Sequence, residues 1–451
     1  MGRGPAAPTR RRLTPALLLI AGLGAAGLLA APSPVGETQG GPPPPNILVI
    51  VTDDQRRGTM AAMPRTRQIF QDGGVRLPNA LVTTPQCCPS RASIFTGQYV
   101  HNHGVTEIAR SDELDPTETL QYHLKQAGYR TALFGKFLKG PRQRRKPAYF
   151  DRAFMAASKD YDLHHPMQDY FHARHAVRFL RDLEREDADE PWALFVNFRS
   201  PHPPFIPARR YSDAPVPGAY EATPAVRERH FGDKNPQFRK ARRPWDRRGA
   251  AATRRGHMRM LMSVDDGVDR IFGELRRSGE IADTLAFYTS DNGFFWGEHG
   301  IQTGKFLPYR EAVEVPYYIR WPGRLARGTT DRRLAANIDI APTIYDAVGI
   351  APSYVPDGRS LLGSETREWL LLEGPGGSVR RWPRWNDAYY DGRRHFIRWR
   401  NGHEEYYDLR HDPWELEGRF FEGPKRRTRI DPRPFRDALD AAADCAGSSC
   451  P

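Results

Sequence analysis

Cysteine is scarce in this sequence, with four residues among 451. Cys445 and Cys450 stand close together near the C-terminus and could form a disulfide in an oxidising compartment. Cys87 and Cys88 are adjacent, and adjacent cysteines rarely pair because the bond would be strained. The adjacent pair therefore requires an explanation other than a disulfide.

Long apolar stretches are also missing after the N-terminus, so we expect no membrane-spanning segment there and no stable membrane partner. The one apolar segment, residues 13–31, follows arginines at positions 3 and 10–12 and ends in small residues. This order predicts a signal peptide over residues 1–31, followed by a Pro/Gly-rich linker over 32–45. The arginines also fit a twin-arginine signal loosely. We expect a secreted or cell-envelope protein; an uncleaved membrane anchor is the alternative.

The sequence supports neither a zinc protein nor a nucleic-acid-binding protein. The His and Cys spacings typical of a zinc site are absent. Nucleic-acid recognition motifs are absent as well, and an export signal also argues against a nucleic-acid partner. The formal charge is +13; the predicted signal peptide holds four arginines and no acid, so the mature chain keeps +9. The basic clusters, at 142–146, 239–248 and 425–429, are either solvated surface or an attraction for an anionic substrate.

Strand and helix patterns alternate along the chain. Four short runs rich in β-branched and aromatic residues, typical of strands buried on both faces of a parallel sheet, occupy 46–52, 129–134, 193–198 and 284–289. Between them, apolar residues recur at helical spacing over 170–183 and 261–275, and Ser278-Gly279 predicts the end of the second helix. This alternation predicts an α/β sandwich.

The second half of the chain is less regular. Residues 207–256 are dense in Pro, Arg and Gly, and we interpret them as a long excursion near the mouth of a site. Aromatic and polar residues alternate over 387–399 and 404–409, which predicts an antiparallel hairpin with its turn at 400–402. We therefore expect a main domain over 46–360 and a small C-terminal antiparallel α+β subdomain with a tail over 361–451.

Charged or imidazole side chains follow each of the four strand-like runs: Asp53-Asp54, Lys136, His202 and Asp291-Asn292. Each alone is most simply a turn signal. In open α/β sheets, however, ligands bind at the carboxyl ends of the strands, so together they indicate a site. Its aspartates and asparagine offer only oxygen ligands, which favours Ca²⁺, with Mg²⁺ the lesser candidate.

The segment Cys87-Cys88-Pro89-Ser90-Arg91, continued by Ala-Ser-Ile-Phe-Thr-Gly, resembles the Cys-x-Pro-Ser-Arg signature of the formylglycine-dependent (type I) sulfatases. In that family the first cysteine of the motif is oxidised to an aldehyde by a formylglycine-generating enzyme. The resemblance therefore implies a formylglycine at Cys87, rather than at Cys88, and implies that enzyme as a partner during maturation.

The resemblance covers nearly all of the chain after the predicted signal. It includes residues 46–55, 79–105, 290–304 and 315–323. Asn79-Ala-Leu-Val, the double cysteine and His101-Asn-His-Gly look most like the N-acetylglucosamine-6-sulfatases and extracellular heparan sulfatases. The family implies an alkaline-phosphatase-like α/β/α sandwich with a mostly parallel sheet, and makes 46–360 its catalytic domain.

The resemblance also assigns roles. Asp53, Asp54, Asp291 and Asn292, together with residue 87, would hold the calcium ion, which polarises the sulfate group. One hydroxyl of the hydrated aldehyde would attack sulfur, and the second would lose its proton to expel sulfate. Arg91 would hold the diol. Lys136 and Lys305 would bind sulfate oxygens, and His202 would be the acid for the leaving alcohol.

One position departs from the pattern of many arylsulfatases. These carry a histidine two residues after the strand-end lysine, where Leu138 stands here. The glucosamine-6-sulfatase-like group also lacks that histidine, so the departure supports this subgroup. It leaves open which group takes the proton from the second hydroxyl.

The sequence thus predicts hydrolysis of a sulfate ester, with a sulfated sugar such as N-acetylglucosamine 6-sulfate, or an aryl sulfate, as substrate. A phosphonate monoester or phosphodiester hydrolase could share the fold, metal and formylglycine, and turnover of paired esters would separate the two. The alternative that is not an enzyme is a protein that binds anionic polysaccharides and keeps Cys87 unmodified.

Overall fold

The computed structural model describes residues 43–140, 145–155, 167–220, 223–241, 246–374, 384–418 and 430–451. Residues 44–451 form one compact unit. The predicted signal peptide and nearly all of the linker, like most of the three basic clusters, lie outside the described residues. Within the described part, no helix has the length and apolar character needed to cross a bilayer.

The central sheet has eight strands in the order β5-β4-β6-β1-β7-β8-β2-β9. Their bounds are β1 Asn46–Thr52, β2 Val75–Arg76, β4 Arg130–Gly135, β5 Arg152–Met155, β6 Trp192–Asn197, β7 Thr284–Ser290, β8 Tyr318–Arg320 and β9 Thr329–Thr330. All neighbouring pairs are parallel except those that β8 makes with β7 and β2. The four predicted strands are β1, β4, β6 and β7, which lie side by side in the middle.

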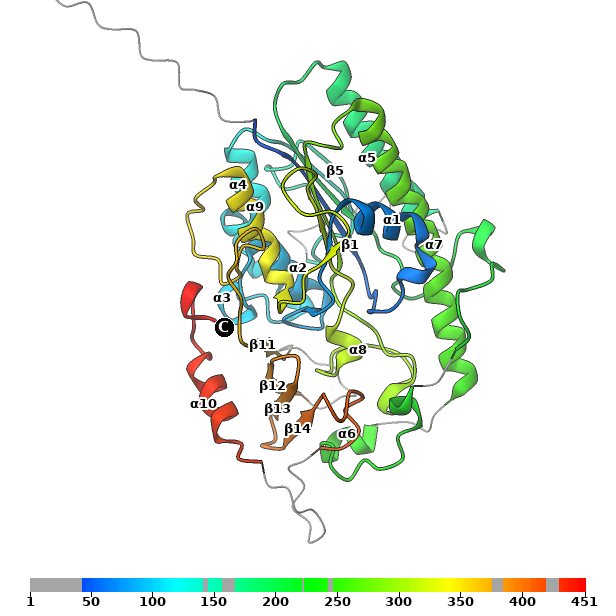
Figure 1. The fold of residues 1–451 in the computed structure, drawn as a ribbon, viewed down its shortest axis with the longest axis vertical. Helices are drawn as coiled ribbons and strands as arrows, with labels where there is room; N and C mark the ends of the chain where they lie inside the picture. Colours follow the sequence, from blue (N-terminus) through cyan, green and yellow to red (C-terminus); the bar gives the residue numbers. More distant parts are fainter. Residues whose placement is uncertain are drawn as a thin grey trace, which may run out of the picture. The chain divides into compact units, whose positions relative to one another are not determined.

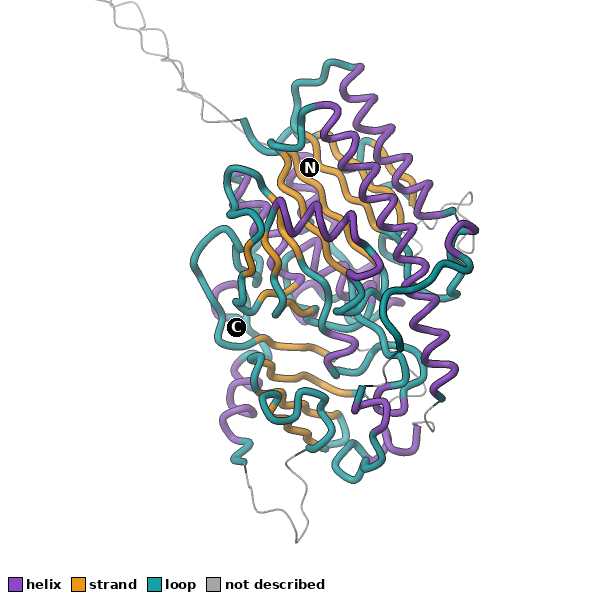
Figure 2. Tube along the Cα trace, turned by 45° about the vertical axis from the view of Figure 1, so that its right-hand side comes forward, coloured by secondary structure: helices purple, strands orange, loops and turns teal. Residues whose placement is uncertain are grey.

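Both faces of this sheet are covered by helices (Figures 1 and 2). Alternate residues of β1 enter different cores: Ile47, Val49 and Val51 enter one, and Leu48 and Ile50 enter the other. The first core holds residues of α2 (Cys87–Thr96), α4 (Leu120–Gln126) and α9 (Ile340–Val348). The second holds residues of α1 (Pro64–Gly73), α5 (Gln168–Arg185) and α7 (Arg247–Ser278). The predicted α/β/α sandwich is confirmed.

Helix α7 ends as the sequence predicts, since Gly279 follows Ser278 in the left-handed conformation with φ +83°. Its start was predicted wrongly, because residues 247–256 belong to the helix and not to the irregular excursion. Asp246 caps the helix by accepting a hydrogen bond from the Gly249 amide at 3.0 Å. The alanines at 250–252 are strong helix formers and outweigh the two nearby glycines that suggested a loop.

A four-stranded antiparallel sheet lies at the C-terminal end of the chain (Figure 1). Its strands are β11 Leu370–Glu373, β12 Trp385–Tyr390, β13 Arg394–Trp399 and β14 Glu404–Asp408. The hairpin turn at 400–402 is confirmed, but residues 387–399 are two strands instead of one. Asp391 turns the chain between them by accepting bonds from the amides of Arg393 and Arg394 at 2.8 and 2.6 Å.

The remaining α-helices and β-strands of the described residues are short. They are α3 Val100–His103, α6 Pro236–Ala241, α8 Arg310–Val313, α10 Arg433–Ala441 and the parallel pair β3 Ala80–Leu81 and β10 Ala335–Ala336. Cys445 and Cys450 form a disulfide after α10. A third core joins the C-terminal sheet to residues such as Leu307 and Tyr309 of the preceding region. The domain boundary at residue 360 stays a prediction.

Candidate active site

The pairing of β1 with β7 brings two acidic segments together. The two strands are in parallel register from Asn46 opposite Thr284 to Thr52 opposite Ser290. Asp53-Asp54 and Asp291-Asn292 therefore leave the sheet at the same level. The Asp54 amide donates to Asp291 Oδ1 at 3.1 Å, which ties the two segments together.

Helix α2 brings the cysteine motif to the same place. Cys87 is its first residue, and Arg91 lies one turn later on the same side. Arg91 Nε donates to Asp291 Oδ2 at 2.8 Å, and its Nη1 donates to the carbonyl of Lys136 at 2.9 Å. Its Nη2 is buried and has no hydrogen-bond partner among the described residues. Arg91 thus links the start of α2 to the ends of β4 and β7 and keeps one donor free.

The carboxylates form a compact group of oxygen ligands. Ligand oxygens of Asp53, Asp54 and Asp291 all lie within 4.8 Å of one another, and all three residues are buried. Asn292 Nδ2 donates to Asp54 Oδ1 at 2.6 Å, which leaves the amide oxygen of Asn292 as an acceptor. Among the described residues, Asp53 Oδ1, Asp54 Oδ2 and Asn292 Oδ1 have no hydrogen-bond partner.

Buried carboxylate oxygens without partners are costly, because water no longer solvates them. A hard cation bound by oxygen ligands would satisfy all three atoms at once. Four of the five residues predicted to hold calcium, all except Cys87, therefore offer oxygen atoms that lie together and fit such an ion.

Two lysines face this group. Lys136 Nζ lies 2.5 Å from Asp53 Oδ2 and 3.9 Å from Asp291 Oδ2. Lys305 Nζ contacts Asp54 Oδ1 and lies 2.9 Å from Cys87 Sγ. Burial lowers the pKa of both lysines, but the aspartates outweigh it and hold each pKa above its usual value. Both ammonium groups therefore stay charged near neutral pH.

Burial and neighbouring charges shift the pKa values of the other groups of the site in different directions. Burial raises the pKa of the Cys87 thiol in spite of the two lysines. Burial also raises the pKa of Asp291 to about 6, with Asp53 adding to the effect. For Asp53 burial acts in the same direction, but Lys136 and the other cations outweigh it and lower its pKa well below the usual value.

His202 reaches the site from the loop after β6. One of its ring nitrogens lies within 4.8 Å of Cys87 Sγ and of a carboxylate oxygen of Asp53. Its Nδ1 lies 2.6 Å from the carbonyl of Pro203 and 3.1 Å from Arg199 Nη2. Burial lowers the pKa of His202. The structure therefore places all of the predicted catalytic and metal-binding residues in one cluster.

Two residues near the site were not predicted from the sequence. Arg199 fixes the His202 loop by donating to the carbonyls of His202 and Pro203. His257, in α7, is fully buried between aromatic rings, and Trp296 Nε1 donates to its Nδ1 at 3.4 Å. Only their positions in the sequence could have pointed to these two residues. Arg199 precedes the predicted acid, His202, by three residues, and His257 lies one helical turn before Leu261 of the apolar stripe.

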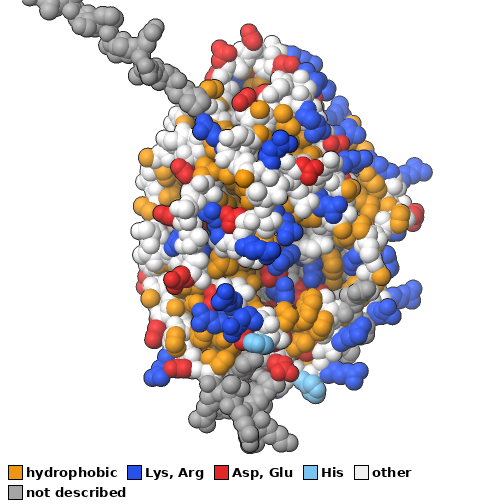
Figure 3. Space-filling view, viewed as in Figure 1, with side chains coloured by type: hydrophobic (Ala, Val, Ile, Leu, Met, Phe, Trp, Pro, Cys, Tyr) orange, Lys and Arg blue, Asp and Glu red, His pale blue; other side chains and the backbone are white. Residues whose placement is uncertain are grey.

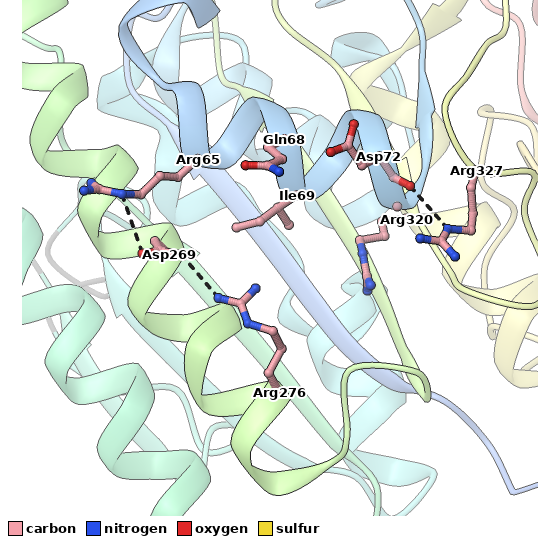
Figure 4. Close-up of a pocket in the computed structure, with 9 residues that line it drawn as sticks. Arg65, Gln68, Ile69, Asp72, Asp269, Arg276, Arg320 and Arg327 are labelled. Atoms are coloured by element: carbon pink, nitrogen blue, oxygen red, sulfur yellow. Dashed lines mark hydrogen bonds and ion pairs between the residues drawn. The ribbon is translucent and has the colours of Figure 1, made fainter.

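A pocket of about 390 Å³ lies elsewhere, between α1, α7 and β8 (Figure 4). Arg320 of β8 pairs with Ala286 near the start of β7, so this pocket lies at the opposite end of the strands from the site. Arg327 donates to the carbonyl of Asp72 at the end of α1, and Arg276 lies in the last turn of α7. Cations are stabilised at the C-terminal ends of helices, which accounts for these arginines without a ligand.

The sequence profile of the sulfatase family matches residues 45–350, more than half of the chain, and the chain belongs to this family. It is 34% identical over 330 residues to the extracellular sulfatase SULF-1 homolog of Drosophila melanogaster, a match that covers 68% of this chain and 30% of the relative. It is 28% identical over 367 residues to the N-acetylglucosamine-6-sulfatase of Homo sapiens, covering 71% and 65%. The chain thus spans 30% to 65% of the length of these two relatives.

Solved structures share the fold. The protein BT4656, in complex with its substrate D-glucosamine-2-N,6-O-disulfate, superposes with a TM-score of 0.68 at 23% identity, covering 84% of this chain and 94% of its own. The phosphonate monoester hydrolase of Agrobacterium radiobacter superposes with a TM-score of 0.67, also at 23% identity, covering 83% and 91%. These likenesses confirm the alkaline-phosphatase-like architecture.

Proposed function

We propose that this protein is an exported sulfuric ester hydrolase, a sulfatase whose nucleophile is a formylglycine made from Cys87. The observation that carries the proposal is the placement of Cys87. Its Sγ lies 2.9 Å from Lys305 Nζ and within 4.8 Å of ligand atoms of Asp53 and His202. The first cysteine of the family motif therefore stands where a cation, a carboxylate and an imidazole meet.

An unmodified thiol fits this position poorly as a nucleophile. Burial raises the pKa of Cys87, so the group stays a thiol near neutral pH, and the thiolate is the reactive form. When present, the hydrated aldehyde would supply an attacking hydroxyl, and a calcium ion held by Asp53, Asp54, Asp291 and Asn292 would polarise the sulfate group.

The side chains around residue 87 have distinct tasks in this proposal. Arg91 Nη2, buried and without a partner among the described residues, is available to hold a hydroxyl of the modified residue. Lys136 and Lys305 bind oxygens of the sulfate, where negative charge grows during the reaction. His202 gives a proton to the leaving alcohol, and Arg199 keeps its ring in place.

Charge balance supports an anionic substrate. Three cations face three buried carboxylates in the site: half-buried Lys136 with buried Lys305 and Arg91, against Asp53, Asp54 and Asp291. These charges cancel, so a bound divalent ion leaves the site positive. A sulfate ester, which carries one negative charge, compensates part of that excess.

The substrate is a sulfated carbohydrate, with N-acetylglucosamine 6-sulfate first and aryl sulfates second. This follows from the relatives, which include an N-acetylglucosamine-6-sulfatase and an extracellular sulfatase. We place the protein outside the cytoplasm, by the twin-arginine route, after a formylglycine-generating enzyme has acted on it. Residues 46–360 form the catalytic domain and residues 361–451 the C-terminal subdomain and tail.

Hydrolysis of a phosphonate monoester is the second candidate. It is favoured by the likeness to the Agrobacterium radiobacter hydrolase, whose TM-score of 0.67 is almost that of BT4656. Sulfate and phosphonate esters have similar shapes, so the same cations and oxygen ligands suit both.

Paired esters distinguish these activities. The protein, produced with a formylglycine-generating enzyme, is assayed on N-acetylglucosamine 6-sulfate and 4-nitrophenyl sulfate against 4-nitrophenyl phenylphosphonate, with Cys87→Ala as control. We expect faster hydrolysis of the sulfates and its loss in the variant. A preference for the phosphonate would establish the second candidate. If the converted protein cleaves none of these esters, the remaining hypothesis is a non-catalytic protein that binds anionic polysaccharides.

A further inference from the structure

The backbone on both sides of Lys305 has an unusual conformation. Gly304 and Phe306 both have a positive φ, of +126° and +85°. Glycine adopts such a φ at little cost, whereas a residue with a bulky side chain rarely does. A residue like Phe306 keeps this conformation only where surrounding contacts impose it. The contacts that hold Phe306 therefore also fix the backbone from which Lys305 reaches the site.

The C-terminal sheet supplies one of these contacts. Trp385, the first residue of β12, donates from its Nε1 to the carbonyl of Phe306 at 2.8 Å. Trp385 is buried in the core that joins this sheet to the preceding region. On the other side of Lys305, the amide of Phe295 donates to the carbonyl of Gly304 at 2.9 Å. The Lys305 segment is therefore held between the loop after β7 and a strand of the C-terminal sheet.

We propose that Trp385 is a positioning residue for Lys305, through which the C-terminal sheet takes part in the reaction. The inference rests on the proposed sulfatase function, in which the Lys305 ammonium binds oxygens of the sulfate. A cation that already stands in place stabilises the transition state without the cost of moving there. Lys305 Nζ lies 2.9 Å from Cys87 Sγ, so a shift of the backbone at Phe306 would move the ammonium relative to the reacting atoms. A misplacement of about 1 Å can lower a rate about 100-fold.

The neighbouring strand offers a matched control. Trp399 of β13 pairs with Trp385 across the sheet, and the two side chains belong to the same core. Both residues are 1% exposed. Among the described residues, Trp399 Nε1 has no hydrogen-bond partner. A change of tryptophan to phenylalanine thus removes the same atoms from the same core at both positions, but removes a bond to the Lys305 segment at only one.

The first test measures kcat and KM on 4-nitrophenyl sulfate for converted wild type, Trp385→Phe and Trp399→Phe, below the melting temperature of each. We expect Trp385→Phe to lower kcat and kcat/KM together by about tenfold, the pattern of an interaction that acts in the transition state. Trp399→Phe should keep the wild-type kcat. If Trp385→Phe does not fold, 3-benzothienylalanine at position 385 replaces it in the test, because this analogue keeps the shape of the indole ring and lacks its N–H.

A double variant separates positioning from a general loss of structure. In Lys305→Ala no ammonium remains to be positioned, so adding Trp385→Phe should lower kcat/KM by less than about twofold further. A further tenfold loss in the double variant would overturn the proposal. An unchanged kcat in Trp385→Phe, or equal losses in the two tryptophan variants, would overturn it as well. If converted wild type hydrolyses no sulfate ester, the proposed function itself fails, and the two failures are therefore distinguishable.

Discussion

Lys305 contacts Cys87, the position of the proposed nucleophile. Its Nζ contacts Asp54 and lies 2.9 Å from Cys87 Sγ and 3.7 Å from Asp53 Oδ1. Because the aspartates keep it charged, it presents a permanent cation where sulfate oxygens would bind.

Removal of this cation should reduce catalysis without unfolding the protein. We expect Lys305→Ala to lower kcat/KM on a sulfate ester about 100- to 1,000-fold, the usual effect of losing one group that stabilises charge in the transition state. Lys139→Ala, which removes an exposed lysine three residues after Lys136, is the control and should change kcat/KM little. Similar rates for both variants would contradict the role given to Lys305.

His299 gives a pH-dependent test at the same scale. Burial lowers its pKa, but Glu228, 2.7 Å from its Nδ1, and the other carboxylates outweigh burial and raise the pKa to about 9. The pair's contribution to stability is therefore complete below the ordinary histidine pKa of 6.5 and is lost as the pH rises through about 9.

His299→Gln should accordingly lower the free energy of unfolding more at about pH 6 than at about pH 10. Denaturant titrations of the wild type and the variant at both pH values measure the difference. A destabilisation that is equal at the two pH values would show that the protonated ring is not what stabilises this loop.

At the scale of elements, α7 supports the site through a glycine. A Cβ at Gly256 would meet Phe205 at 2.6 Å, so any side chain there displaces the loop that carries His202. Gly273, further along the same helix, has only the tip of Arg276 nearby, at 3.9 Å.

The two glycines should therefore respond in opposite ways to the same substitution. Gly273→Ala should raise the melting temperature, since alanine favours a helix over glycine by about 1 kcal/mol. Gly256→Ala should lower kcat, because the displaced loop misplaces the acid. Full activity of Gly256→Ala would mean that the loop does not depend on this contact.

Much of this arrangement could be predicted from local patterns. The run at 46–52 is rich in β-branched residues on both faces, and the strand has those bounds in the structure. The motif at Cys87 and the polar residues after four strands were enough to predict where the candidate site lies, because parallel strands bring their carboxyl ends to one edge of the sheet. Ser278-Gly279 marked the end of α7 for a similarly local reason.

Other features depend on contacts that are distant in the sequence. In the sequence His257 is an ordinary helical residue. Only the fold shows that the loops after His202 and Asn292 pack against its ring. The lowered pKa of Arg254 is equally invisible in the sequence, because burial and the charge of Arg56, which is remote in the chain, cause it. The split of residues 387–399 into two strands follows from Asp391, whose side chain binds backbone amides in the turn.

At the scale of the whole molecule, the proposed metal site would join the ends of two central strands to α2. Without a cation, three buried oxygens lack hydrogen-bond partners within the described structure: Asp53 Oδ1, Asp54 Oδ2 and Asn292 Oδ1. Ion binding to the folded state should therefore stabilise the entire protein.

Chelation should reveal this linkage. We expect EGTA to lower the melting temperature and abolish sulfate-ester hydrolysis, with Ca²⁺ restoring both better than Mg²⁺ does. Asn292→Ala, which removes one of the oxygens, should show a smaller melting-temperature difference between the two conditions. Unchanged stability and activity in EGTA would contradict a resident calcium ion.

The proposed chemistry depends on one covalent change, the conversion of Cys87 to formylglycine. Positively charged surface is prominent on the face shown in Figure 3, and a divalent ion bound in the site would add to the attraction for anionic substrates. These features serve catalysis only if residue 87 provides a hydroxyl nucleophile in place of a thiol with a raised pKa.

Mass spectrometry of tryptic peptides tests this directly, on protein made in a host that converts a control sulfatase. The account predicts a peptide lighter by about 18 Da at Cys87, with Cys88 unchanged, as expected for conversion of a thiol to the aldehyde of a nucleophilic catalyst. An unmodified Cys87 in that host would contradict the proposed mechanism and favour a protein that binds anionic sugars without cleaving them.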